Sequence, residues 1–175
     1  MTNLIKLSTN RLIIRNFDSS DFSDLHEIFS DDDVMLYVEP SYTPSQTAQF
    51  LQNFCIDRVP PGALAVELKE TGKMIGYILF KPMDEPDVYE TGWIFNKDYW
   101  CKGYTFEACS KLIRYGFEEM NLHKICAETI DSVKAIPLLK KLGMTQEGVQ
   151  RSHTKSNDGI WHDLHWYAIL ADEYV

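Results

Sequence analysis

The junction between a predicted strand and the longest predicted helix most limits what this chain can fold into. The strand covers Val88–Asn96, a short turn follows, and Gly103 stands where a helix over Tyr104–Met120 should begin. The helix is predicted from a broad apolar face, which comprises Ala108, Cys109, Leu112, Ile113, Phe117 and Met120. Such a junction leaves the first N–H groups of the helix unpaired, at the positive end of its dipole. A place of this kind can bind pyrophosphate, and the neighbouring residues decide whether this one does.

One strand and two helices are predicted before that junction. Leu12–Phe17 is rich in β-branched residues and is typical of a strand. Asp18–Asp21 opens a helix with one apolar face, and Asp31–Asp33 ends that helix in an acidic loop. Thr43–Gln46 combines a capping box with proline at the first helical position, so a second helix should begin there and end at Pro60–Gly62.

The remaining segments complete a mixed α+β pattern. The turn signal Thr71-Gly72 predicts an antiparallel hairpin, whereas the helix after Val88–Asn96 lets that strand run parallel to Lys124–Ile130. The other predicted elements are the strands Ala63–Lys69 and Met74–Lys81, a helix ending at Leu142-Gly143, and a closing hairpin of Thr145–Thr154 and Ile160–Leu170. We therefore predict a mixed, mostly antiparallel sheet of about seven strands, flanked by about four helices.

Length and charge exclude several classes of protein. The 175 residues fit a single domain over residues 1–175. No apolar run approaches the ~18–20 residues that cross a bilayer, and Met1–Lys6 lacks the apolar centre of a secretory signal. We expect a cytoplasmic protein with no membrane partner. The net charge of −9 also argues against binding nucleic acid, which needs a basic face.

The cysteines and histidines do not show metal-ligand spacing. None of the four cysteines forms a C-x-x-C pair, and none of the five histidines forms H-E-x-x-H. We expect no metal site, and we expect each cysteine to be a small buried side chain in a reducing compartment. The cysteines are Cys55, Cys101, Cys109 and Cys126.

The residues around Gly103 resemble a known coenzyme A loop. Trp100–Ala108 is similar to the sequence Tyr-Trp-Gly-Lys-Gly-Tyr-Ala-Thr-Glu-Ala of the GNAT acetyltransferase superfamily, in its ribosomal-protein N-terminal acetyltransferase (RimJ/RimL-like) branch. Four other segments resemble that branch in the same order along the chain. They are Thr9–Arg15, Glu90–Ile94, Leu139–Met144 and Gly159–Asp163.

The resemblance implies a GNAT-type fold, acetyl-coenzyme A as cosubstrate and a set of binding residues. The backbone of Ile94 and Phe95 would pair with the pantetheine arm, and an amide of this pair would polarise the thioester carbonyl. The residues implied to bind the pyrophosphate through their amides are Cys101, Lys102, Gly103, Tyr104 and Thr105. For Trp100 and Tyr104, packing in the core or loop is the alternative to a direct role at the cofactor.

Acetyl transfer to an amine needs a base, and Glu90 is the candidate because its strand leads to the cofactor. The alternative is that Glu90 is a solvated strand residue or an ion-pair partner. Asp163 is expected to order the closing hairpin.

Three departures from the family pattern lie near the reactive end of the cofactor. Cys101 and Thr105 replace small residues in the phosphate loop. Ser132 and Ala135 stand where the family carries Asn and Ser, so the hydroxyl that protonates the leaving thiolate is missing unless Ser132 or a tyrosine replaces it. Pro137 requires the following helix to start near Ala135 or to bend.

The sequence therefore predicts an N-acetyltransferase that moves an acetyl group directly to a primary amine, either a protein N-terminus or a small molecule. The alternative is a catalytically degenerate domain of the same fold that binds coenzyme A as a regulatory or interaction module. A hydrolase is disfavoured because there is no G-x-S-x-G elbow. The acceptor is expected near Asp31–Glu39 and Gln150–Ile160, and the resemblance makes a homodimer possible.

Overall fold

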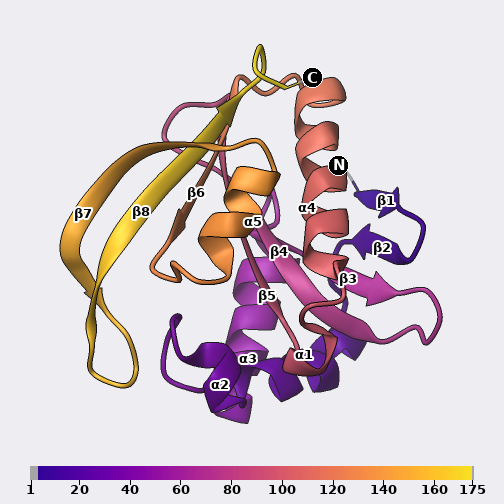
Figure 1. Cartoon of the computed structure of the whole chain (residues 1–175). Coiled ribbons are helices and arrows are strands. Elements are labelled where there is room, and N and C mark those ends of the chain that lie inside the picture. Colours follow the sequence, from indigo (N-terminus) through magenta and orange to yellow (C-terminus); the bar gives the residue numbers. More distant parts are fainter. Residues whose placement is uncertain (1–3, 175) are drawn as a thin grey trace.

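In the computed structural model, which describes residues 4–174, eight strands form one sheet in the order β1-β2-β3-β4-β5-β6-β8-β7 (Figure 1). Neighbouring strands run antiparallel except β5 and β6, which run parallel as predicted. The strands are β1 (Lys6–Ser8), β2 (Leu12–Arg15), β3 (Ala63–Leu68), β4 (Met74–Pro82), β5 (Val88–Phe95), β6 (Lys124–Thr129), β7 (Thr145–Lys155) and β8 (Trp161–Leu170). The predicted mixed, mostly antiparallel sheet is confirmed.

Helices cover both faces of the sheet. On one face, Leu112 and Leu139 pack against Ile78 and Ile125 in the larger hydrophobic cluster. On the other face, helical apolar side chains pack around Tyr77 in a second cluster. The α-helices are α1 (Phe22–Phe29), α2 (Asp32–Met35), α3 (Pro44–Gln49), α4 (Tyr104–Glu118) and α5 (Ala135–Lys141). Because α4 and α5 lie on the first face and α1 and α3 on the second, the central strands are buried from both sides.

The second predicted helix begins as its sequence requires and then widens. Thr43 Oγ1 accepts a hydrogen bond from the Gln46 amide, and the Gln46 side chain accepts one from the Thr43 amide. Past Gln49 the helix continues as a π-helical segment, η2 (Phe50–Ile56). Short 3₁₀ turns precede α1 and α4, at η1 (Ser19–Asp21) and η3 (Lys97–Tyr99).

Two elements differ from the sequence prediction. Asp31–Asp33 does not form an acidic loop, because Asp31 accepts hydrogen bonds from the amides of Asp33 and Val34 and caps α2. The acidic residues thus stand at a helix start, where the dipole favours them. β1 was not predicted, since three residues are too few to show a period. Within the described residues the sheet therefore has eight strands instead of about seven.

The closing hairpin carries the contact predicted for Asp163. Its carboxylate accepts a hydrogen bond from the Ser152 amide at 2.8 Å, where Ser152 adopts a φ of 47° in an irregular part of β7. Asp163 thus links the two strands of the hairpin, as a residue that orders it would. Residues 1–3 and Val175, which belong to the predicted domain 1–175 and include the first half of Met1–Lys6, lie outside the described residues. None of the helices between residues 4 and 174 combines the length and the apolar character that a membrane crossing requires.

Candidate active site

β5 and β6 separate near the middle of β5. Val88, Tyr89 and Glu90 pair with Lys124–Cys126, and the pairing of these two strands then ends. β5 continues as far as Phe95 in register with β4. Figure 1 shows the two strands diverging toward their C-terminal ends. We call the edge of β5 over Thr91–Phe95, along which β6 is no longer paired, the β5–β6 opening.

The alternation of hydrogen bonds along β5 shows which backbone groups face this opening. The Val88 carbonyl accepts from the Met83 amide, and the Asn96 amide donates to the Ile75 carbonyl. In a regular antiparallel pair, every second residue between these two points must also face β4. The backbone groups of Ile94 therefore face Tyr77 of β4, whereas those of Trp93 and Phe95 face the opening. Of the two residues implied to pair with the pantetheine arm, only Phe95 is oriented to do so.

The loop after β5 leaves the start of α4 open. Gly103 has a φ of 80° and stands at the N-cap of α4, where no side chain caps the helix. Cys101 is also left-handed, with a φ of 58°, and the side chains of Cys101 and Lys102 are exposed. The expectation that Cys101 is buried is wrong because it lies in this projecting turn; the other three cysteines are buried. Exposed amides at an uncapped helix start fit a phosphate group.

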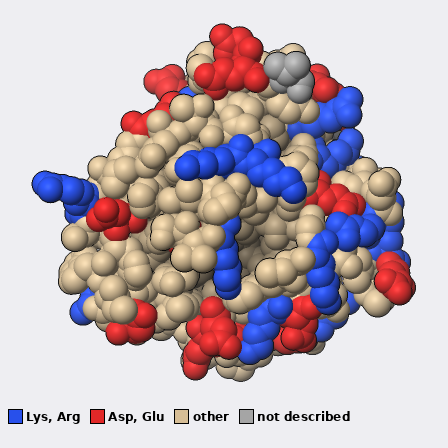
Figure 2. All heavy atoms as spheres, in the orientation of Figure 1, with Lys and Arg blue, Asp and Glu red and all other residues tan. Residues whose placement is uncertain are grey.

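Basic side chains surround the loop. The Lys102 ammonium donates to the Asp98 carbonyl at 2.8 Å, and the Lys134 ammonium lies 3.9 Å from the centre of the Trp100 ring. The Arg11 guanidinium donates to the Lys102 carbonyl at 3.0 Å. Figure 2 shows Lys and Arg side chains over α5 and around the first turn of α4, on a face that is hollowed at its centre. This local positive charge suits an anionic ligand despite the net charge of −9.

Trp100 and Tyr104 both pack in the core or the loop, which was the predicted alternative to a direct role at the cofactor. The Trp100 indole N–H donates to the Phe95 carbonyl at 2.8 Å, and its ring packs against both hydrophobic clusters. The Tyr104 ring lies beside Tyr99 and beneath Arg11. Trp100 thus binds a carbonyl at the end of the β5–β6 opening. Thr105 follows in the first turn of α4 and is half-buried.

Glu90 lies on the face of the sheet covered by α1 and α3 and is held in an ion pair. Its carboxylate lies 2.6 Å from the Lys81 ammonium, directly across the β4–β5 pair, and its side chain is 15% exposed. Glu90 is therefore an ion-pair partner, as the alternative prediction had it. A role as base would require this ion pair to open.

A second carboxylate, Glu128, lies on the same face and was missed by the sequence analysis. Glu90 pairs with Cys126 in the parallel register, so Glu128, two residues further along β6, points to the same side at the β5–β6 opening. Partial removal from water, followed by the Glu90 charge, raises the pKa of Glu128. Only the parallel register, which is not visible in the sequence, brings these two carboxylates together.

The turn after β6 places Ser132 at the surface. The Asp131 side chain accepts hydrogen bonds from the amides of Val133 and Lys134 and so shapes the turn before α5. Ser132 is exposed in this turn, and α5 begins at Ala135 with Pro137 in its first turn. The prediction that Pro137 makes this helix start near Ala135 is confirmed.

The loops predicted to receive the acceptor meet on the α1–α3 face. Asn157, in the β7–β8 turn, donates from its side chain to the carbonyls of Met35 (2.8 Å) and Glu39 (2.7 Å). A pocket of about 430 Å³ lies at this contact and is lined by Asp32, Leu36, Pro40, Ser41, Asn157 and Asp158. The turn of the closing hairpin is therefore tied to the segment after α2.

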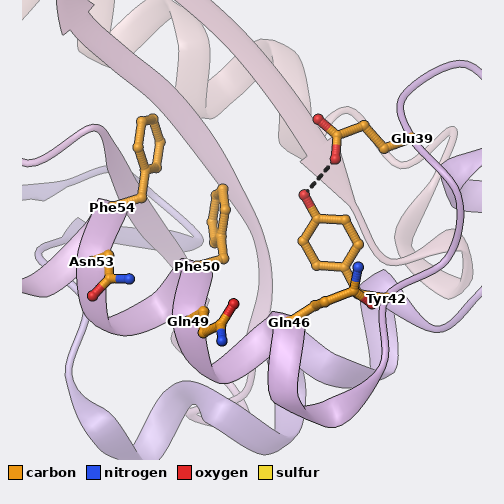
Figure 3. Close-up of a pocket in the computed structure, with 7 residues that line it drawn as sticks. All are labelled: Glu39, Tyr42, Gln46, Gln49, Phe50, Asn53 and Phe54. Atoms are coloured by element: carbon orange, nitrogen blue, oxygen red, sulfur yellow. Dashed lines mark hydrogen bonds between the residues drawn. The ribbon is translucent and has the colours of Figure 1, made fainter.

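A second pocket, of about 310 Å³, has aromatic walls (Figure 3). Phe50 and Phe54 project side by side from η2, and the Tyr42 hydroxyl donates to Glu39 at 2.6 Å. Burial, then the Glu39 carboxylate, raise the pKa of Tyr42 to about 12. Phe50 lies 5.8 Å, between ring centres, from Tyr77, which pairs with Ile94 of β5. We call this site the aromatic pocket; through Tyr77 it borders β5.

Comparisons with known proteins agree with this geometry. The acetyltransferase (GNAT) domain family matches residues 11–145. The uncharacterized N-acetyltransferase YnaD of Bacillus subtilis is 35% identical over 171 residues, which cover 96% of this chain and 98% of that protein.

Two solved structures also resemble the chain. A GNAT-family acetyltransferase from Bacillus anthracis is 32% identical, with a TM-score of 0.86 over 96% of this chain and 99% of that one. Spermidine N-acetyltransferase from Vibrio cholerae, solved with CoA and spermine, shares the fold at 21% identity, with a TM-score of 0.82 over 95% of this chain and 99% of that one.

Proposed function

Because this chain belongs to the GNAT acetyltransferase family, we propose that it transfers the acetyl group of acetyl-CoA directly to a primary amine that arrives from the α1–α3 face of the sheet. Acetyl-CoA, the cosubstrate of the family, supplies an acetyl group activated as a thioester. The divergence of β5 and β6 beside an uncapped helix start is the observation that carries the proposal.

The residues at this site fit the cosubstrate. The backbone groups of Trp93 and the amide of Phe95 face the β5–β6 opening, where an extended pantetheine arm can pair with them as a strand would; the Phe95 carbonyl already accepts from Trp100. The amides at Gly103 and in the first turn of α4 are available to the pyrophosphate, and a Cβ at Gly103 would meet only the Arg11 guanidinium, at 3.5 Å. An amide that faces the opening also stabilises negative charge developing on the acetyl oxygen.

We assign the role of base to Glu128, with Glu90 as its charged neighbour. An alkylamine is mostly protonated at neutral pH and must lose a proton before it can attack. The Glu90 carboxylate is engaged by Lys81, whereas no salt bridge or side-chain hydrogen bond involves Glu128 within the part of the chain that the structure describes. Its raised pKa makes Glu128 a stronger base than an ordinary carboxylate. Ser132 remains the residue that we propose donates a proton or a hydrogen bond to the leaving sulfur.

The test of this assignment is turnover of Glu128→Gln with acetyl-CoA and a panel of amines, measured by thiol release and by the mass of the acetylated product. We expect kcat to fall by ~10²–10⁴-fold while acetyl-CoA affinity is retained, because only a proton acceptor is lost. Glu147→Gln is the matched control, since Glu147 is a carboxylate of the same sheet that pairs with Lys124 at 2.7 Å. Equal turnover in both variants would contradict the role of Glu128.

The pH dependence of kcat tests the roles of Glu128 and Glu90 independently. A base works when deprotonated, so kcat should rise with pH through the raised pKa of Glu128. Glu90→Gln removes a negative neighbour that contributes to this shift, so the rising limb should move to lower pH. A limb that stays in place in Glu90→Gln would contradict the coupling of the two carboxylates.

The competing function is a domain that binds CoA without turnover. Both proteins would bind acetyl-CoA and gain thermal stability from it, by about 2.7 kcal/mol at a hundredfold excess over Kd. Only the enzyme yields an acetylated amine. Binding without any product, across small amines and peptides with free N-termini, would favour the regulatory module.

A further inference from the structure

Arg11, in the turn between β1 and β2, reaches the first turn of α4. Its Nε donates to Glu107 Oε2 at 2.7 Å, and its Nη1 donates to the Lys102 carbonyl at 3.0 Å. The guanidinium carbon also lies 4.3 Å from the centre of the Tyr104 ring. A planar guanidinium can make these three contacts at once, and a lysine ammonium cannot.

Several hydrogen bonds hold the Glu107 carboxylate in place. Its Oε1 accepts hydrogen bonds from the Thr9 hydroxyl at 2.6 Å and from the Arg11 amide at 2.9 Å. Partial burial alone would raise the pKa of Glu107, but the bonds from Thr9 and Arg11 outweigh it and lower that pKa. The β1–β2 turn thus holds a charged Glu107 at the start of α4. We call Thr9, Arg11 and Glu107 the α4 clasp.

The loop Cys101–Gly103, which we call the phosphate loop, needs contacts that fix its backbone. Cys101 and Gly103 both have positive φ, which costs a non-glycine residue roughly 1–2 kcal/mol. The loop is exposed at Cys101, Lys102 and Gly103 and has few side chains to fix it. In addition, the negative charge of Glu107 opposes an anion at the same helix start unless a cation neutralises it. Arg11 binds both the loop carbonyl and that carboxylate.

We propose that Arg11 is a positioning residue for acetyl-CoA: it fixes the Lys102–Gly103 backbone so that the amides at the start of α4 stay turned toward the phosphates. The inference rests on the phosphate placement in the proposed function. It predicts that Arg11 matters for ligands that carry the phosphates and not for the thioester end alone.

The experiment compares Arg11→Gln and Arg11→Lys with wild type, using acetyl-CoA and S-acetylpantetheine, a thioester that lacks the pyrophosphate. We expect both variants to weaken acetyl-CoA binding by about tenfold or more in calorimetry, since charge-assisted bonds are lost. The kcat at saturating acetyl-CoA and the kcat/KM for S-acetylpantetheine should stay within about twofold of wild type, because the reacting end is untouched.

Arg114→Gln is the matched control. Arg114 lies on α4 and donates through Nε to Glu118 Oε2 at 2.8 Å, the same pairing as in the α4 clasp but three turns away from the loop. Its acetyl-CoA affinity should equal that of wild type. A loss as large as that of Arg11→Gln would show that breaking any arginine–glutamate pair of this helix has the effect, and would overturn the proposal.

Two other results would also overturn it. Wild-type affinity in Arg11→Lys would mean that charge alone suffices, and an equal loss for S-acetylpantetheine would mean general structural damage. If both Arg11 variants fail to fold by circular dichroism, Thr9→Val tests the clasp, because it leaves Arg11 in place and removes the 2.6 Å bond to Glu107 together with the local bonds of the Thr9 hydroxyl to the Leu12 backbone. Unchanged acetyl-CoA affinity in Thr9→Val would then overturn the proposal. A wild-type protein that does not bind acetyl-CoA would instead contradict the proposed function.

Discussion

Gly103 is the single residue on which the proposed phosphate site depends most. Its φ of 80° is a conformation that glycine adopts freely and that costs other residues strain. The space around it is open, since a Cβ would meet only Arg11 Nη2 within 4 Å. A substitution therefore acts through the backbone and through shielding of the amides, not through a clash with the core.

Gly103→Val should weaken acetyl-CoA binding by at least tenfold, because a β-branched side chain would stand between the amides and the phosphates. Gly72→Val is the control, since Gly72 has a φ of 72° with nothing within 4 Å of its Cβ position. Both variants should lose a similar ~1–2 kcal/mol of unfolding free energy. Urea unfolding and calorimetry measure the two effects separately. Equal acetyl-CoA affinities would place the phosphates elsewhere.

At the scale of elements, the sequence predicted those whose signals are local. The capping box at Thr43 and Gln46 and the turn at Gly72 each specify their own geometry, and both are observed. The strand and helix around Gly103 were also identified correctly, as β5 and α4.

The active-site details that were missed depend on contacts between distant segments. The backbone direction of Ile94 depends on the hydrogen-bond alternation with β4, which side-chain periodicity does not reveal. Glu128 joins Glu90 only through the parallel register of β5 and β6. Arg11 and Glu107 are 96 residues apart in the sequence, so no local pattern could show that they are in contact. Each of these features follows from tertiary packing.

The π-helical segment η2 is the element that builds the aromatic pocket. Its wide turn projects Phe50 and Phe54 side by side, facing Tyr42 and the Glu39 carboxylate (Figure 3). Single-turn π-helical insertions are rare and occur frequently at functional sites. Aromatic faces beside a carboxylate suit a cation, which supports an acceptor with a second positive charge.

We propose that the aromatic pocket binds the second ammonium of a diamine acceptor, so Glu39→Gln should lower kcat/KM for diamines relative to monoamines of equal chain length. Losing an exposed ion pair with the distal ammonium is expected to cost up to about fivefold in kcat/KM for diamines and little for monoamines. Glu85→Gln, which alters an exposed carboxylate in the β4–β5 turn, is the control. An unchanged ratio of the two kcat/KM values in Glu39→Gln would remove the aromatic pocket from acceptor recognition.

For the whole molecule, the distribution of charge matters more than its sum. The net charge is −9, yet Lys and Arg gather on the face that carries α5 and the start of α4 (Figure 2). Carboxylates line the opposite approach, with Glu39, Glu90 and Glu128 on the α1–α3 face. The two faces therefore suit an anionic cosubstrate and a cationic acceptor, and we propose that these meet at the β5–β6 opening.

Amide hydrogen exchange with and without acetyl-CoA tests this account most directly. We expect acetyl-CoA to slow exchange at Trp93–Phe95 and at Cys101–Glu107, where the arm and the phosphates should bind. The β3–β4 turn around Gly72, a similarly exposed glycine turn, should exchange at the same rate in both states. If acetyl-CoA slows exchange only in other segments, and exchange at Trp93–Phe95 and Cys101–Glu107 stays the same, the placement of acetyl-CoA between β5 and β6 is contradicted.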